Sequence, residues 1–224
     1  MPSSALFPID WQQYEHVVLD FGGVLYQINH QLTARAFAKL GFTQFDREFR
    51  HGAQSQLFNE LECGEIDEQD FMLKLRNHCT SNTSIEQVQD AWNAMLLELR
   101  PEATGWVQSL EQHFDLLLLS NTNAIHAAHF EQDILKNKGR QFSSAFRQII
   151  YSHRLGKRKP HPETYAHVSK EYGLTPERTL LIDDTKENVA GALKAGWAAV
   201  YFDVEAYSFG QFIRGIGYED FLNG

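Results

Sequence analysis

The chain of 224 residues has few cysteines, no long apolar run and no early basic cluster. Its two cysteines, Cys63 and Cys79, have no histidine or cysteine partner at the spacing of a zinc site, so we read both as ordinary thiols. No lysine or arginine precedes Arg35, which argues against a signal peptide. Without a membrane span either, we expect a cytoplasmic protein.

Positive charge is also scarce. The chain carries 20 basic and 29 acidic residues, for a net charge of −9. Nucleic acids and anionic membranes bind clustered positive charge, so neither is an expected partner. A hydrophobic content of 43% is enough to bury a full core, and the length fits two domains or one domain with a large insertion.

Five short apolar runs, each bounded by polar or turn residues, predict strands buried on both faces: 17–19, 116–119, 148–150, 180–182 and 198–202. Helical patterns separate the later runs. One opens with Pro162 and stops at Gly173, and another covers 186–195 and stops at Gly196. This alternation predicts an α/β fold in three layers, with a parallel sheet between two layers of helices.

The interval between the first two strands is long and has helical periodicity without a convincing strand. Within it, Ser84 and Gln87 form a capping box ahead of one apolar helical face that includes Trp92, Leu96 and Leu99. We therefore predict a core domain of residues 1–27 and 105–224, and a helical cap domain of residues 28–104 inserted after the first strand.

Polar side chains stand where three of the predicted strands end. Asp20 follows the first strand, in the sequence HVVLDFGGVL; Ser120 and Asn121 follow the second; Asp183 and Asp184 follow the fourth. In an open parallel sheet, ligands bind beyond the carboxyl ends of the strands. These residues are therefore expected at one site.

Their chemistry fits phosphoryl transfer. Asp20 can attack phosphorus as a nucleophile, forming an aspartyl-phosphate. Because two anions repel, the site needs a hard cation, and Asp183 and Asp184 offer oxygen ligands for Mg²⁺. Asn188 could orient Asp184 from the following helix. Each aspartate alone also fits a helix cap or a turn.

Two further elements complete the predicted site. The Ser120 hydroxyl and the backbone amides after it, starting at Asn121, can hold phosphate oxygens, although a polar turn explains them equally well. Lys159, in a loop with other basic residues, can neutralise the transferring group, although a solvated basic loop is the simpler interpretation of any one of them. The joint order along the chain favours the functional interpretation.

The segments DFGGVL, LLSNTN, RKP and IDDTKENVAGA together resemble the motifs of the haloacid dehalogenase superfamily, in the branch of glucose-1-phosphatase-like sugar phosphatases. The resemblance implies a Rossmann-like core with a helical cap. It implies that Asp20 is the nucleophile, that Ser120 and Asn121 bind phosphate, and that Lys159 balances charge. Asp184, helped by Asp183 and the Gly22 carbonyl, would bind Mg²⁺.

One position departs from the family. Most phosphatases of this superfamily carry a second aspartate, the general acid and base, two residues after the nucleophile, where this chain has Gly22. Loss of acid–base help typically costs about a hundred- to ten-thousandfold in rate. A hexose 1-phosphate, which has a comparatively good leaving group, is therefore the expected substrate. Polar cap residues are candidates to face the sugar: His51, Gln54, Gln56, Asn59 and Glu60.

Three alternatives remain open. A dehalogenase of the same fold also lacks the second aspartate but has no use for the paired Asp183 and Asp184. A phosphonate hydrolase tolerates Gly22 but needs a cap lysine, for which the insertion offers Lys39 and Lys74. A protein that only binds a phosphorylated metabolite would keep the ligand shell without turnover. Ten histidines show no metal-site spacing, and His126 with His129 fits an exposed helical pair.

Overall fold

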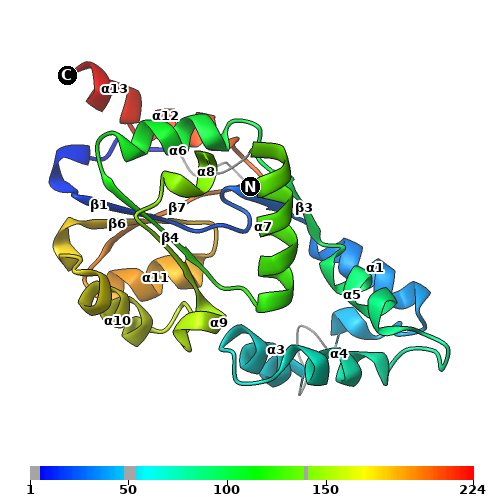
Figure 1. Cartoon of the computed structure of the whole chain (residues 1–224). Coiled ribbons are helices and arrows are strands. Elements are labelled where there is room, and N and C mark those ends of the chain that lie inside the picture. The colour runs from blue at the N-terminus through cyan, green and yellow to red at the C-terminus, as the bar shows by residue number, and fades with distance from the viewer. Residues whose placement is uncertain (1–5, 48–53, 139–140) are drawn as a thin grey trace.

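A computed structural model describes residues 6–47, 54–138 and 141–224, and its centre is a parallel sheet of five strands (Figure 1). The strands lie in the order β5-β4-β1-β6-β7. Their bounds are β1 His16–Leu19, β4 Asp115–Ser120, β5 Gln148–Tyr151, β6 Thr179–Asp183 and β7 Ala198–Tyr201. All five predicted strands are therefore present, each within one residue of the predicted bounds.

Helices cover both faces of the sheet. Successive strand residues point to opposite faces: Leu117 and Leu119 pack with α10 and α11, whereas Leu116 and Leu118 pack with the helices of the other layer. The first layer consists of α9 Ser152–Leu155, α10 Pro162–Tyr172 and α11 Lys186–Lys194. The other consists of α6 Ala103–Glu111, α7 Ala124–Lys138, α8 Gln141–Ser144, α12 Phe209–Gly215 and α13 Tyr218–Asn223. The predicted three-layer fold is confirmed.

Two short 3₁₀ helices lie near the amino ends of strands. They are η1 Trp11–Gln13, before β1, and η2 Pro176–Arg178, before β6. The Trp11 ring is buried, and its Nε1–H donates to the carbonyl of Ile216, 3.0 Å away. This bond ties the start of the described chain to the end of α12.

The insertion after β1 packs around a separate hydrophobic cluster, to which Ile125 of α7 also contributes. Its helices are α1 His30–Lys39, α3 Gln54–Glu62, α4 Glu68–Arg76 and α5 Ile85–Asn93. Phe37, Phe58, Phe71 and Trp92 form the centre of that cluster. Figure 1 shows these helices beside the core, next to α7 and α9. The domain division at residues 28 and 104 stays a proposal.

The prediction of an insertion without strands was wrong. Strands β2 Tyr26–Ile28 and β3 Leu96–Leu99 pair antiparallel where the chain leaves the core and returns to it. The helix of the Ser84 capping box accordingly ends at Asn93 and does not carry Leu96 and Leu99. The Thr33 hydroxyl donates to the Trp92 carbonyl and accepts from the Met95 N–H, which satisfies these groups as the helix ends.

Among the described residues, no helix combines the length and the apolar character needed to cross a lipid bilayer. The cytoplasmic location stays a prediction.

Candidate active site

The polar residues predicted from strand ends do meet at one edge of the sheet. Strand β1 lies between β4 and β6. Ser120 is the last residue of β4, Asp183 is the last residue of β6, and Asp20 directly follows β1, where its N–H donates to the Ile182 carbonyl (3.0 Å). The parallel register therefore brings the three side chains to the carboxyl edge of the sheet.

Lys159 is the centre of the ion-pair network at this edge. Its side chain is fully buried, with Nζ at 2.9 Å from Asp20 Oδ1 and 2.6 Å from Asp183 Oδ2. Burial by itself lowers the pKa of a lysine, but the two carboxylates outweigh it and raise the pKa of Lys159 above its usual value. Lys159 is therefore positively charged and holds Asp20 in place.

The Asn121 side chain fixes the loop that carries Lys159. Its Nδ2 donates to the Lys159 carbonyl and its Oδ1 accepts from the Lys159 N–H, both at 2.9 Å. The next amide is also engaged, because the Thr122 N–H donates to Ser152 Oγ. In this structure the Asn121 side chain therefore positions the lysine, while the Ser120 side chain lines the cavity above the sheet.

Three carboxylates lie close enough to share one cation. Asp20, Asp183 and Asp184 each place an oxygen within 4.8 Å of the others. Oxygen ligands of this kind fit Mg²⁺. The Asn188 amide donates to both oxygens of Asp183, at 3.0 and 3.2 Å, so the prediction that Asn188 orients Asp184 was wrong. Because Asn188 lies in the first turn of α11, its side chain reaches back to the end of β6.

Gly23, three residues after Asp20, leaves room for the carboxylate of Asp184. Gly23 has φ +87°, and a Cβ there would lie 1.9 Å from Asp184 Oδ2. Gly22 lines the same cavity as Asp20 and Asp184. A side chain at position 23 would therefore displace the Asp184 carboxylate.

The buried site holds more acidic groups than basic ones. Burial raises the pKa of Asp20 to about 8, with Asp183 and Asp184 adding to the rise against the effect of Lys159. Burial and the charge of Asp183 raise the pKa of Asp184 to about 6. One lysine thus leaves the acidic cluster short of positive charge, as expected for a site built around a divalent cation.

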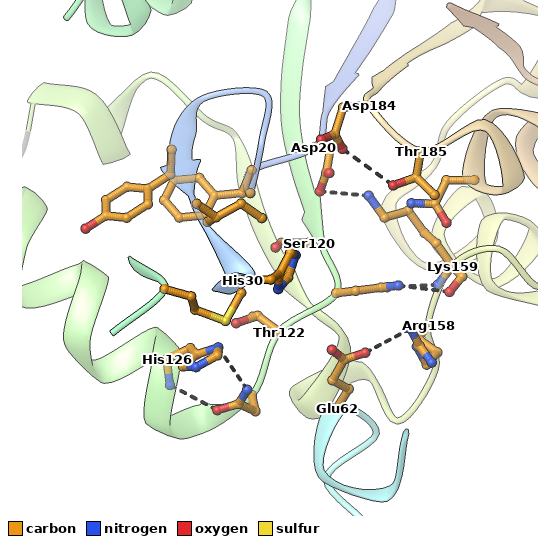
Figure 2. A pocket seen from close by; sticks show the side chains of 18 of the residues that line it. Asp20, His30, Glu62, Ser120, Thr122, His126, Arg158, Lys159, Asp184 and Thr185 are labelled. Atoms are coloured by element: carbon orange, nitrogen blue, oxygen red, sulfur yellow. Dashed lines mark hydrogen bonds and ion pairs between the residues drawn. The ribbon is translucent and has the colours of Figure 1, made fainter. Parts of the chain in front are cut away.

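A cavity of about 440 Å³ lies above these groups and is lined on one side by the insertion. Its walls include core residues around Asp20 and several insertion residues, among them Phe58, Glu62, Trp92 and Met95. Figure 2 shows Glu62 and Arg158 at one end of this pocket and Asp20 with Asp184 at the other. This volume suits a small ligand.

Glu62 was not among the predicted polar cap residues, although it lies beside them in the sequence. Of those, Gln56, Asn59 and Glu60 line a second cavity on the other side of Arg158 instead. His51 and the Gln54 side chain lie outside the described residues. Neither Lys39 nor Lys74 lines the cavity above Asp20, which leaves the phosphonate hydrolase alternative without its lysine.

His126 was also misjudged from the sequence. It is buried and lines the cavity, so the prediction of an exposed pair with His129 was wrong for this member. Its ring stacks on Trp92, its Nδ1 lies 3.2 Å from the Asn123 amide, and its Nε2 lies 3.2 Å from the Trp92 carbonyl. Burial lowers the pKa of His126 to about 3, so the imidazole is neutral. A neutral ring that donates to the Trp92 carbonyl links α7 to the insertion.

Comparison with known families agrees with this geometry. The model of the haloacid dehalogenase-like hydrolases matches residues 14–196, which is most of the chain. The chain therefore belongs to the haloacid dehalogenase-like hydrolase family.

Similar proteins include a curated phosphatase and two solved structures. The D-ribitol-5-phosphate phosphatase of Bacteroides thetaiotaomicron is 27% identical over 175 residues, covering 78% of this chain and 85% of that protein. A wild-type HAD family enzyme from the same organism, solved with magnesium and inorganic phosphate, is 26% identical with a TM-score of 0.76, over 87% of this chain and 96% of that one. A predicted HAD-like hydrolase from Porphyromonas gingivalis is 29% identical with a TM-score of 0.76, over 90% and 97%.

Proposed function

We propose that this protein is a Mg²⁺-dependent phosphatase that hydrolyses a small phosphorylated sugar through an aspartyl-phosphate on Asp20. The observation that carries the proposal is the position of Asp20, which contacts Lys159 and shares a possible cation site with Asp183 and Asp184. An Asp20 oxygen attacks phosphorus and the bond to the sugar oxygen breaks. Water then attacks the same phosphorus, which releases phosphate and restores the carboxylate.

The metal site would be formed by Asp20, Asp183, Asp184 and the backbone carbonyl of Gly22. When bound, Mg²⁺ would offset the repulsion between the carboxylate and the phosphate dianion. The acidic cluster supports this assignment, and so does the magnesium and phosphate complex of the Bacteroides enzyme. Asp183 also holds Lys159 and accepts from Asn188, so it is expected to serve mainly as the support of the site.

The phosphate would lie between Asp20 and Ser120. We assign the Ser120 hydroxyl and the Asn121 backbone to the phosphate oxygens, and the Lys159 ammonium to the charge that develops on them. The engaged Thr122 amide is left out of this assignment because it already donates to Ser152. The Asn121 side chain already bonds both the N–H and the carbonyl of Lys159. The backbone of Lys159 therefore needs no rearrangement when substrate binds.

Two substrate classes are candidates. Gly22 stands where the general acid would be, and this favours a hexose 1-phosphate, because an anomeric leaving group depends less on a general acid than an ordinary alkoxide does. A pentitol 5-phosphate follows from the name of the Bacteroides relative. Both fit a cavity of about 440 Å³, and they differ in the leaving group that must be protonated.

A panel of hexose 1-phosphates and pentitol 5-phosphates, assayed for phosphate release with and without Mg²⁺, tests the function. We expect release that requires Mg²⁺ and disappears in Asp20→Asn. Faster release from the pentitol 5-phosphates would reject the hexose 1-phosphate preference and leave the phosphatase standing. Binding of these compounds without any release would identify the protein as a metabolite-binding module instead.

A further inference from the structure

Glu62 is a charged insertion residue placed inside the candidate active-site cavity. It is the last residue of α3, and its Oε2 lies 3.0 Å from Nη2 of Arg158, which precedes Lys159 in the core loop. Arg158 also donates to Asn59 of α3. This pair therefore joins the insertion to the same loop that brings Lys159 to Asp20 (Figure 2).

The pair leaves one acceptor and one donor unused among the described residues. Glu62 Oε2 and Arg158 Nε are both buried atoms without a hydrogen bond, since the close approach of Nη2 to Oε2 lacks hydrogen-bond geometry. Burial raises the pKa of Glu62, against the effect of Arg158 and Lys159, as expected for a carboxyl short of hydrogen bonds. A buried polar atom left without a partner is costly, so a ligand that supplies partners is favoured.

Hydroxyl groups match these two atoms. An alcohol donates one hydrogen bond and accepts others, so adjacent hydroxyls on a carbon chain can donate to Glu62 and accept from Arg158. Hydrogen bonds to charged groups are the stronger kind. The neighbouring wall is apolar, with Phe58 stacked on Trp92 at a ring distance of 5.4 Å, and it offers a surface for the carbon–hydrogen face of such a chain.

We propose that Glu62 and Arg158 recognise hydroxyl groups on the carbon chain of the substrate and so set its specificity for phosphorylated sugars or sugar alcohols. The inference rests on the proposed phosphatase function, because it takes the phosphate to lie at Asp20 and Lys159. A substrate held at both ends would keep its phosphorus in line with Asp20.

Glu62→Gln tests the inference, because it removes the charge of the carboxylate but keeps its size. With Mg²⁺ present, kcat/KM for ribitol 5-phosphate and glucose 1-phosphate is expected to fall about 10- to 100-fold, mainly through KM, as for loss of a hydrogen bond to a charged group. Activity on ethyl phosphate and p-nitrophenyl phosphate, which lack hydroxyls, should be unchanged. Arg158→Lys, which loses the planar donor fork, should show the same selectivity.

Glu60→Gln is the matched control. Glu60 lies on the same helix but lines the second cavity, where it accepts from Gln56. Glu60→Gln should leave kcat/KM unchanged for substrates with hydroxyls and for substrates without them. Equal loss on all substrates in Glu62→Gln, or no loss on any, overturns the inference.

Wild-type activity on p-nitrophenyl phosphate tests the proposed function separately, since that compound has no hydroxyl to recognise. Binding provides a readout without turnover. Ribitol 5-phosphate should bind Asp20→Asn more tightly than it binds the double variant with Glu62→Gln, while inorganic phosphate should bind both equally. Equal affinity for ribitol 5-phosphate would also overturn the inference.

Discussion

Lys159 shows how one buried charge organises the site. Two carboxylates contact its Nζ, and the side chain is fully buried. Removing one partner of a buried ion pair leaves the other charges uncompensated, which is strongly destabilising. The same contact that orients the nucleophile therefore also supports the fold.

Lys159→Met is expected to lower the free energy of unfolding by about 3–5 kcal/mol, measured by urea denaturation. Phosphatase activity should disappear with it. Lys157→Met is the matched control, because Lys157 is exposed in the same loop and its loss should change stability by less than about 0.5 kcal/mol. Equal effects of the two substitutions would contradict the assigned role of Lys159.

The raised pKa values of Asp20 and Asp184 predict how pH and Mg²⁺ act together. Folding raises the pKa of Asp20 from 3.8 to about 8 and that of Asp184 from 3.8 to about 6. The folded state therefore holds protons that the unfolded state has released, and the metal-free protein should lose stability as pH rises from about 4 to 8. Mg²⁺ competes with these protons, so its binding should release them.

We therefore expect Mg²⁺ to raise Tm more at pH 8 than at pH 6. Calorimetric titration in buffers of different ionisation enthalpy would report the released protons. A rise in Tm that is the same at both pH values, without proton release, would show that Mg²⁺ does not bind at these carboxylates.

The sequence predicted the location of site residues correctly where that location follows from the end of a strand. Asp20, Ser120 and Asp183 follow from strand ends, because parallel strands must bring their carboxyl ends together. The partners of Asn121 and Asn188 did not follow, since an amide can reach several neighbours and only the loop conformation selects one. Glu62 and His126 were missed because their burial depends on how the insertion packs against the core.

At the scale of elements, close packing of α11 positions the Lys159 loop. Gly191 of α11 touches this loop so closely that a Cβ would lie 2.0 Å from the Pro160 carbonyl oxygen. That oxygen belongs to the backbone and cannot rotate away as a flexible side chain can. The helix therefore needs glycine at this turn.

Gly191→Ala is expected to destabilise the protein by about 1–3 kcal/mol, as overpacking of a core does, and to lower phosphatase activity by moving Lys159. Gly105→Ala provides the comparison within another helix, α6, because no atom lies within 4 Å of a Cβ there. That change should stabilise by about 0.5–1 kcal/mol through helix propensity. Thermal melting of both variants measures these changes. A higher Tm for Gly191→Ala than for the unchanged protein would refute the packing argument.

Elements with strong local signals were predictable, and short paired ones were not. The Ser84 capping box and the Gly173 stop of α10 are present as expected. The ribbon of β2 and β3 was not foreseen, because Leu96 and Leu99 continue the helical spacing of α5 and only pairing with Tyr26–Ile28 makes them a strand. Long-range pairing leaves little trace in a short window of sequence.

At the scale of the whole molecule, the cavity belongs to neither part of the chain alone. The sheet edge supplies Asp20, Lys159 and Asp184, and the insertion supplies Phe58, Glu62 and Trp92. Polar contacts that join the parts include those from Arg158 to Glu62 and Asn59 and from His126 to the Trp92 carbonyl. Composition and periodicity indicated an insertion, but its position over the site emerges only from the assembled fold.

The central claim, a covalent phosphoryl group on Asp20, can be tested by acid quench of the protein during turnover with Mg²⁺ and a substrate from the panel. Mass spectrometry of the peptide that contains Asp20 should then show the added mass of one phosphoryl group, absent without Mg²⁺ and absent in Asp20→Asn. Sustained phosphate release by Asp20→Asn, or a phosphoryl group found on another residue, would contradict the account.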